Sequence, residues 1–351
     1  MQATLQADEL RNACKTVSPA LGGFRSVQSM LRIEIQADHG CVEARNEYWG
    51  ISKTVGATDI EAGTVLVPSR PFQALLDSIE GSVTLRTDAA SGRLLVSAAM
   101  TAMELSVGSN DDWIVRSIAE SEPITLPNED LARIGRITFA AAKDLSRPLL
   151  TAVRLDGDLA SATDTRRIAQ ARLSVQLPSI SVPAEFMLDV SRHATSDVHV
   201  VVDMAGIQLS DGGTTWSSRA MVGDYPDLKR FLSLEPSASV TVARSSLLAS
   251  LQRMRVFESD NASVRITTEA NILKLWTQHL EFGEISDQID AHVQFVGTVW
   301  FNSKVLTEAI QAHDSEEVSL LIEAPLDPII LNGSRISQVV MPRAVSDTTR
   351  T

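Results

Sequence analysis

The chain has 351 residues, 44% of them hydrophobic, which is enough to bury large cores and indicates two or three domains. Its formal net charge of −13 argues against a uniformly basic nucleic-acid-binding surface, although an acidic exterior around a basic inner surface would give the same sum. With only Cys14 and Cys41, a disulfide scaffold and a cysteine-rich zinc site are not expected. The amino terminus has no signal-peptide pattern and no apolar run approaches the roughly 20 residues of a membrane span, so we expect a cytoplasmic protein.

A unit of strand, helix, strands, second helix and further strands occurs three times along the chain. The landmarks are Leu10, Leu131 and Leu247 in the first helices, and Pro68, Pro183 and Asn302 just before the second helices. The first set is separated by 121 and 116 residues, and the second by 115 and 119. Two landmarks with nearly the same period predict three α+β domains, at 1–118, 119–235 and 236–351.

The predicted helices are amphipathic, with basic side chains on their outer faces. In the first repeat we place Asp8 as the N-cap, and in the second Asn128. The outward basic residues on the helices of the three repeats are Arg11, Lys15, Arg70, Arg133, Arg136, Lys143, Arg192 and Arg253. A single basic stripe is more often a solvated face than a binding surface. Its recurrence in three repeats favours contact with phosphates, which Lys and Arg can make without reading base sequence.

The segment 149–171 organises the middle of the chain. Two short alternating runs flank Asp156-Gly157-Asp158, and Asp-Gly between such runs is a strong hairpin signal. We therefore predict strands at 152–155 and 159–163 with the turn between them. The second strand leads into the elbow, which we define as residues 163–168, reading TDTRRI.

Three segments at widely spaced positions carry a family resemblance. They read RPLLT at 147–151 followed by ATDTRRI at 162–168, YPDLKRFL at 225–232, and VVMPRAV at 339–345. In this order they resemble the bacterial sliding clamp, the beta subunit of DNA polymerase III, whose motifs include R-P-x-L-T-G, A-T-D-G-H-R-L and V-M-P-M-R-L. With the repeats, the resemblance covers essentially the whole chain.

The resemblance implies an α+β DNA-clamp fold, in which three repeated units per chain line a ring with their helices and place their sheets outside. It implies a homodimer that encircles duplex DNA without sequence preference and slides on it as a processivity factor. DNA polymerase and clamp-loader subunits would bind through short peptide motifs. No enzymatic activity, cofactor or membrane association is expected, and an ATP-driven loader would be a separate protein.

By resemblance, partner peptides with apolar anchors enter a groove between the second and third repeats. The residues carried over to that groove are Leu150, Thr163, Thr165, Arg166, Arg167, Ile168, Pro226, Arg230, Phe231, Pro328, Val339, Val340, Met341 and Pro342. Plain core packing is the alternative for Ile168, Val339 and Met341. Thr165-Arg166 stands where the family has Gly-His, and Phe231 replaces an aliphatic residue, so we expect a smaller and more basic pocket.

The resemblance also adds DNA-binding and dimer residues. Arg25, Lys143 and Arg147 fall in family DNA-contact regions, whereas Asp77 stands at a position that is basic in the family. Ring closure would pair edge strands of the first and third repeats. The expected interface residues are Met103, Leu105, Val256 and Phe257, with the strand at 270–277.

Two alternatives remain open. The six histidines are scattered, and no phosphate-binding loop or nucleophile elbow occurs. Asp156, Asp158 and Asp164 could form the metal cluster of a nucleic-acid hydrolase, although the first two read more simply as turn residues. The groove residues that depart from the family pattern leave a specialised or phage-type clamp paralogue as the other alternative. The short tail 346–351 extends past the family's usual end.

Overall fold

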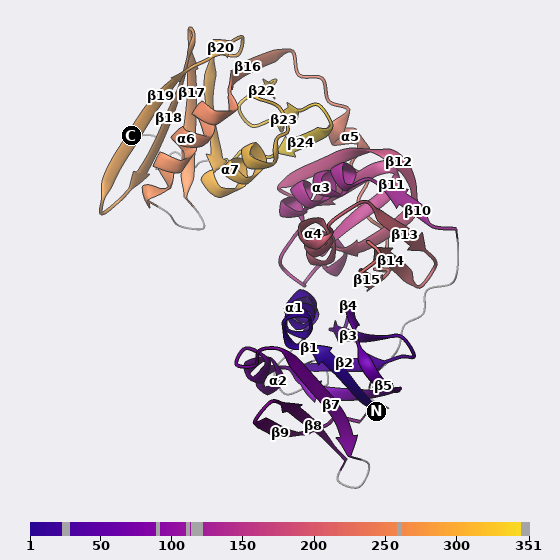
Figure 1. The fold of residues 1–351 in the computed structure, drawn as a ribbon. Coiled ribbons are helices and arrows are strands. Elements are labelled where there is room, and N and C mark those ends of the chain that lie inside the picture. Colours follow the sequence, from indigo (N-terminus) through magenta and orange to yellow (C-terminus); the bar gives the residue numbers. More distant parts are fainter. Residues whose placement is uncertain (23–28, 89–91, 110–112, 114–121, 258–261, 345–351) are drawn as a thin grey trace. The chain divides into compact units, whose positions relative to one another are not determined.

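The computed structural model describes residues 1–22, 29–88, 92–109, 113, 122–257 and 262–344 (Figure 1). The chain divides into two compact units, Met1–Asn128 with Asp189–Ala220, and Glu129–Leu188 with Met221–Thr351. Antiparallel sheets and short helices make up both units. Within the described ranges, no helix combines the length and the hydropathy that crossing a membrane requires.

The helices begin where the repeat predicts. They are α1 (Ala7–Val17), α2 (Ser69–Leu76), α3 (Asn128–Ile137), α4 (Ala184–His193), α5 (Lys229–Leu232), α6 (Arg244–Met254) and α7 (Ser303–Ala312), with 3-10 turns η1 (Ser18–Ala20), η4 (Thr138–Ala140), η5 (Pro148–Thr151) and η6 (Arg255–Phe257). Asn302 caps α7 by accepting a hydrogen bond from the Val305 amide at 3.0 Å. The predicted cap of α1 is wrong, because Gln6 is the N-cap and Asp8 lies inside the first turn.

The first unit contains two sheets. One has the strand order β5-β1-β7-β8-β9, and the other β10-β13-β14-β15-β4-β3-β2-β6. The strands are β1 (Gln2–Gln6), β2 (Met30–Ile35), β3 (His39–Arg45), β4 (Trp49–Gly56), β5 (Thr58–Glu61), β6 (Gly63–Pro68), β7 (Ser82–Asp88), β8 (Arg93–Ala98), β9 (Thr101–Ser106), β10 (Ile124–Leu126), β13 (Val198–Val202), β14 (Gly206–Ser210) and β15 (Thr214–Arg219).

The second unit also has two sheets, ordered β11-β12-β24-β23-β22-β16-β20 and β19-β18-β17-β21. Their strands are β11 (Ala152–Thr163), β12 (Arg167–Pro183), β16 (Ala238–Ala243), β17 (Ser263–Glu269), β18 (Ile272–His279), β19 (Gly283–Asp290), β20 (His292–Val293), β21 (Gly297–Asn302), β22 (Glu317–Ile322), β23 (Ile329–Asn332) and β24 (Ile336–Val340). Helices α6 and α7 pack together, and their apolar sides share one core with strands of both sheets (Figure 1).

The sheet topology repeats three times. The strand before the first helix pairs with the first of three strands that follow the second helix, giving β1-β7-β8-β9, β10-β13-β14-β15 and β16-β22-β23-β24. We call the strands between the two helices of a repeat its inner strands. In two of the three repeats, the last strand of the motif pairs with an inner strand of the preceding repeat: β15 pairs with β4, and β24 pairs with β12. The internal repeat read from the sequence is therefore present in the hydrogen-bonding pattern.

The predicted hairpin turn at Asp156-Gly157-Asp158 is wrong. Strand β11 runs without a break from 152 to 163, and Gly157 (φ 62°) sits at an irregularity where the register with β12 shifts. A glycine with positive φ serves a β-bulge as well as a turn. The chain reverses instead in the elbow, where Thr163 pairs with Ile168.

Candidate functional site

The three segments that carry the resemblance meet in the second unit. Ile168 of the elbow pairs with Val339 of β24, and the Met341 amide donates to the Arg166 carbonyl at 2.9 Å. Leu228 of the 225–232 segment belongs to one buried apolar cluster with Ile168 and Val339. We call this the outer-face cluster, and its members are Ile168, Leu228, Ile330 and Val339, with Tyr225, Phe231, Leu232 and Leu321 partly buried against them.

The segment 225–232 is fixed over this sheet by its tyrosine. The Tyr225 hydroxyl donates to the Ser161 carbonyl at 3.2 Å. Burial raises the pKa of Tyr225, so the phenol stays a hydrogen-bond donor at neutral pH. A hollow of about 560 Å³ lies between this segment and the strands, lined among others by Ser161, Gln170, Tyr225, Pro226 and Leu228.

One aspartate stabilises the turn in the elbow. Asp164 Oδ1 accepts from the amides of Arg166 (2.9 Å) and Arg167 (3.1 Å), an arrangement typical of an Asx-type turn. Thr165 then adopts φ 75°, a left-handed conformation that costs energy for a β-branched residue and none for glycine. Thr165, which stands where the family has glycine, therefore occupies a position whose backbone geometry favours glycine.

Arg167 and Ile168 point to opposite faces of the sheet, since neighbouring strand residues alternate. Arg167 is 7% exposed and pairs across from Val340, which belongs to the helix-side core. Its guanidinium binds Asp164 (Nε to Oδ2, 3.0 Å) and the Glu308 carboxylate of α7, and lies 4.9 Å from the Phe139 ring centroid. Arg167 and Val340 were predicted to line the partner groove together with Ile168, but their side chains lie on the other face of the sheet, toward the helices.

A second hollow, the elbow pocket, lies on this helix side and measures about 580 Å³. It is lined by Ala141, Ala142, Lys143, Asp144, Ser146, Arg147, Leu150, Asp164, Thr165, Arg166, Arg167, Asn302, Lys304, Val305 and Glu308. It brings together residues assigned from the sequence to two different functions, Leu150 and Arg166 to peptide and Lys143 and Arg147 to DNA. The participation of α7 was missed, because nothing in its sequence marks it.

The remaining groove candidates lie around the outer-face cluster. Thr163 shares the face of Ile168, and Pro226 lines the first hollow. Arg230 is exposed and covers the Phe231 ring, with its guanidinium carbon 4.5 Å from the centroid. Met341 is 38% exposed where the strand ends. Pro328 directly precedes β23, and Pro342 follows Met341; both are half-buried.

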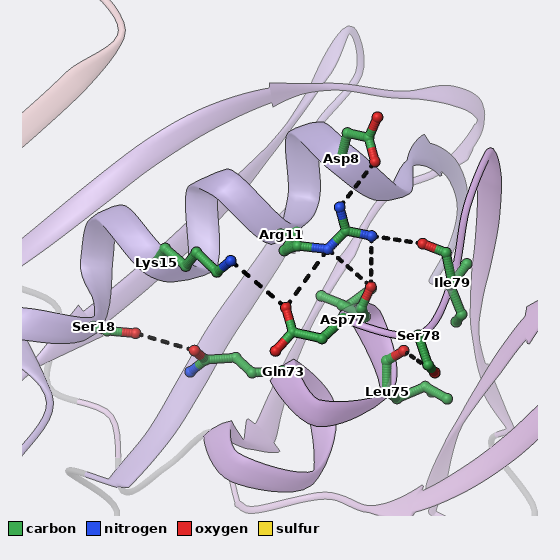
Figure 2. Close-up of polar contacts among 10 residues, drawn as sticks. Asp8, Arg11, Lys15, Ser18, Gln73, Leu75, Asp77, Ser78 and Ile79 are labelled. Atoms are coloured by element: carbon green, nitrogen blue, oxygen red, sulfur yellow. Dashed lines mark hydrogen bonds and ion pairs between the residues drawn. The ribbon is translucent and has the colours of Figure 1, made fainter.

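Arg11 is not an outward-facing cation. Its guanidinium donates to the carbonyls of Leu76 (2.8 and 3.0 Å) and Ile79 (2.6 Å), which closes the carboxyl end of α2 (Figure 2). Asp77 approaches both Arg11 (3.6 Å) and Lys15 (3.7 Å). The predicted stripe on α1 is thus reduced to Lys15, and an acid lies beside it.

Two further predicted DNA contacts are held in ion pairs. Arg133 binds the fully buried Asp130 and also Glu129, and Arg253 binds Asp287 through two nitrogens. Lys143 is not on α3, which ends at Ile137, so the predicted helical stripe stops short of it. The exposed candidates are Lys15, Arg70, Arg136, Lys143, Arg147 and Arg192, while Arg25 lies outside the described residues.

The strand expected at the dimer interface, 270–277, does not lie at a sheet edge. Strand β18, which contains most of 270–277, is paired on both sides, with β17 and β19. Strand β19 is one edge of that sheet, and β9, with Met103 and Leu105, is one edge of the 5-stranded sheet in the first unit. Val256 and Phe257 lie in η6, where Val256 is 72% exposed.

The three aspartates of the hydrolase alternative have separate partners. Asp156 accepts from the Ser179 hydroxyl, Asp158 pairs with Arg172 at 2.7 Å, and Asp164 holds the elbow turn. Among the described residues, no group of three or more His, Cys, Asp or Glu side chains is placed to hold a metal ion.

Comparison with known proteins now adds to this geometry. Residues 229–344 match the family model described as "DNA polymerase III beta subunit, C-terminal domain". The "Beta sliding clamp" of Chlamydia muridarum is 24% identical over 99% of this chain and 100% of its own length, and that of Staphylococcus aureus is 22% identical over 83% and 84%. The chain is similar to bacterial sliding clamps along nearly its whole length.

Solved structures of the family have the same fold. The sliding clamp of Caulobacter crescentus superposes with a TM-score of 0.90 at 19% identity, covering 98% of this chain and 100% of the clamp. The clamp of Bacillus subtilis gives a TM-score of 0.90 at 18% identity, covering 99% and 100%. The chain is divergent from these clamps, since it shares about one identical residue in five with each.

Proposed function

We propose that the chain is a DNA polymerase processivity factor, a homodimeric ring that encircles duplex DNA and tethers polymerase and other partners. The observation that carries this function is the outer-face cluster, where three segments from distant parts of the sequence assemble into one apolar surface beside the elbow. Apolar walls with a few polar groups suit a short peptide with apolar anchors.

The repeated topology supports the proposed ring closure. The last outer strand of a repeat joins an inner strand of the preceding repeat at β15–β4 and at β24–β12. By the same rule, β9 of the first repeat would pair with β19 of the third repeat. Each of these strands is a sheet edge within the single chain. Two copies joined head to tail at these strands close a ring and leave neither edge exposed. Under this proposal the domains are 1–118, 119–235 and 236–351.

Contact with DNA would be made through phosphates. Exposed cations such as Lys15, Arg136 and Arg192 lie on or beside the first and second helices of the repeats. Long cationic side chains neutralise phosphates without fixing a position, which sliding requires. Because Arg11, Arg133 and Arg253 are held by their own repeats, we infer a weaker grip than the full sequence list would give.

The decisive experiment compares circular and linear DNA. The chain is loaded onto nicked circular duplex by a clamp-loader complex with ATP, and retention is followed with increasing salt, alongside the solution mass. A topologically linked dimer stays on circles at high salt and is released when a restriction enzyme linearises them. A monomer, or equal retention on both forms, would contradict the ring.

A specialised clamp with a narrower partner set is the second candidate. It is favoured by Phe231, whose ring occupies the outer-face cluster under Arg230, and by Thr165 in the elbow. Titration with a consensus clamp-binding peptide separates the two, since a replicative clamp of ordinary specificity binds it and a specialised one binds it weakly.

A further inference from the structure

The sheet β19-β18-β17-β21 of the second unit has a buried face and an open face. Helices α6 and α7 pack against the buried face, where alternate strand residues join their core (Figure 1). The open face carries the remaining strand residues. Among them are Arg265 on β17, Trp276 on β18 and Trp300 on β21, and each of these side chains is partly exposed. Two neighbouring tryptophans on the solvent side of a sheet are typical of an interaction surface.

The three residues form one row across three strands, which we call the Trp–Arg row. Arg265 pairs with Trp276 on one side and with Trp300 on the other. The strands of the two tryptophans are therefore about 9.5 Å apart. Their ring centroids are only 6.0 Å apart, at an interplanar angle of 89°. Both indoles thus lean over Arg265, whose guanidinium carbon lies 4.4 Å and 5.8 Å from the two centroids. Stacking of this kind holds a guanidinium in one orientation.

The row is held in place, but its cation has no anionic partner. Trp276 Nε1 donates to Glu284 Oε2 at 3.1 Å, which fixes that ring. Within the part of the chain that the structure describes, the Arg265 guanidinium makes the two ring contacts and binds no carboxylate. A guanidinium presents its N–H groups in a planar fork that fits both oxygens of a carboxylate. The row therefore offers an oriented anion site flanked by two apolar rings.

The charges around the row favour a single carboxylate over a polyanion. The open face carries as many acidic as basic residues, namely Glu269, Glu284, Asp290, Arg265, Lys274 and, at its end, Arg343. Lys274 pairs with Glu269 at 2.7 Å, and Arg343 donates to the Ser263 hydroxyl at 2.8 Å. A nucleic-acid strand would bring several phosphates close to these acids, whereas a polypeptide can place one carboxylate at Arg265.

We propose that the Trp–Arg row binds a partner polypeptide that carries proline next to an acidic residue. The carboxylate accepts from the Arg265 guanidinium, and proline rings pack on the indoles of Trp276 and Trp300. Proline suits this surface because a proline-rich segment is extended before binding and docks on aromatic side chains at small entropic cost. None of the three residues lines the elbow pocket, so the proposal goes beyond the proposed function and adds a second partner site.

Fluorescence anisotropy with the labelled peptides Pro-Pro-Glu-Pro-Pro and Pro-Pro-Gln-Pro-Pro tests the proposal on the full-length protein. Neither peptide contains leucine or phenylalanine, so the outer-face cluster is not probed. The protein binds the Glu peptide about fivefold more tightly at low salt, the upper end for a partly exposed ion pair. Arg265→Lys keeps the charge but loses the planar fork, and it removes most of this difference. Lys274→Gln is the matched control, because it removes an exposed cation from the same face, and it leaves both affinities unchanged.

A readout on the unsubstituted chain covers the case in which Arg265→Lys folds poorly. With fluorotryptophan at all five tryptophan positions, titration with the Glu peptide shifts the fluorine signals of Trp276 and Trp300 and leaves those of the buried Trp49 and Trp216 in place. No binding, equal affinity for the two peptides, or shifts confined to other tryptophans would overturn the proposal. A single-stranded oligonucleotide that bound more tightly than the Glu peptide and lost affinity in Arg265→Lys would make the row a nucleic-acid contact instead. Neither failure bears on the ring, which the circular-DNA experiment tests separately.

Discussion

Arg167 and Glu308 form a partly buried ion pair that ties the elbow to α7. Their side chains are 8% and 27% exposed, and Asp164 holds the same guanidinium from the other side. Removing one partner of such a pair leaves a charge in a poorly solvated place, which costs more than the pair contributes as a whole. The pair therefore sets the shape of the elbow pocket as well as local stability.

We expect Glu308→Gln to lower the free energy of unfolding by about 2 kcal/mol, less than for a fully buried pair because Asp164 remains. Urea denaturation of the full chain measures the loss. Glu269→Gln is the control, since Glu269 pairs with Lys274 through exposed side chains and the substitution changes stability by less than about 1 kcal/mol. Equal effects of the two variants would show that the Arg167 pair is not a special contact.

Thr165→Gly should stabilise the chain. At φ 75° a threonine has a steric conflict that glycine lacks, and the gain exceeds the entropy cost of glycine by about 0.5 to 1 kcal/mol. Thr267→Gly, in the middle of β17, gives the opposite sign because strand geometry suits threonine. Thermal unfolding of both variants checks the pair of signs, and a destabilised Thr165→Gly would mean that the threonine side chain has its own role.

Long-range organisation was predictable where periodicity repeated. The starts of α2, α4 and α7 follow Pro68, Pro183 and Asn302 as the spacing predicts, because three copies of a landmark reinforce each other. The structure at Asp156-Gly157 was not predictable, since a local Asp-Gly signal fits a β-bulge and a turn equally well. Which of the two forms depends on whether the partner strand continues, and that is decided by the rest of the sheet.

Site residues were predicted by segment more reliably than by direction. The three motif segments do meet, but Arg167 and Val340 point away from Ile168 and Val339. The direction of a strand residue depends on where the strand starts, and the misplaced turn removed that reference. The role of Arg11 depends on the carboxyl end of α2, 65 residues away, which helix periodicity does not reveal.

Asp77→Asn should strengthen binding to duplex DNA. The substitution removes the acid 3.7 Å from Lys15, and it also removes a negative charge from the carboxyl end of α2. We expect roughly threefold tighter binding at low salt, with a salt slope steeper by up to about 0.9 if Lys15 gains a phosphate. Glu61→Gln, an acid on the edge strand β5, is the control for net charge. The same gain in both variants would assign the effect to overall charge.

Val256→Glu should dissociate the proposed dimer. Val256 is 72% exposed within the chain, so the substitution leaves the fold intact and places a charge in the expected contact. Val296→Glu is an equally exposed control, also at 72%, in the loop before β21. Sedimentation velocity should show monomers for the first variant and dimers for the second. A dimeric Val256→Glu protein would place the interface elsewhere.

Acid should destabilise the third repeat through His313. Its side chain is 1% exposed, Nε2 donates to the Glu317 carbonyl at 3.2 Å, and Nδ1 has no partner. Burial lowers the pKa of His313 below its ordinary value of 6.5, so the fold holds the neutral ring. Its contribution is therefore complete above about pH 6.5 and is lost as the pH falls through the folded pKa, at up to about 1.4 kcal/mol per pH unit.

Urea denaturation between pH 7.5 and about pH 5 measures this dependence. His313→Gln should flatten the curve in that range, because glutamine takes up no proton in the unfolded chain. His292→Gln replaces an exposed histidine of the same unit and leaves the curve unchanged. If the wild type and His313→Gln lost stability in parallel, the acid sensitivity would come from other groups. Glu43 and Asp189 are not among them, because burial raises the pKa of each carboxyl and gives the opposite sign. Those two carboxyls stabilise the fold more as the pH falls. A steeper loss of unfolding free energy in the wild type than in His313→Gln is therefore assigned to His313.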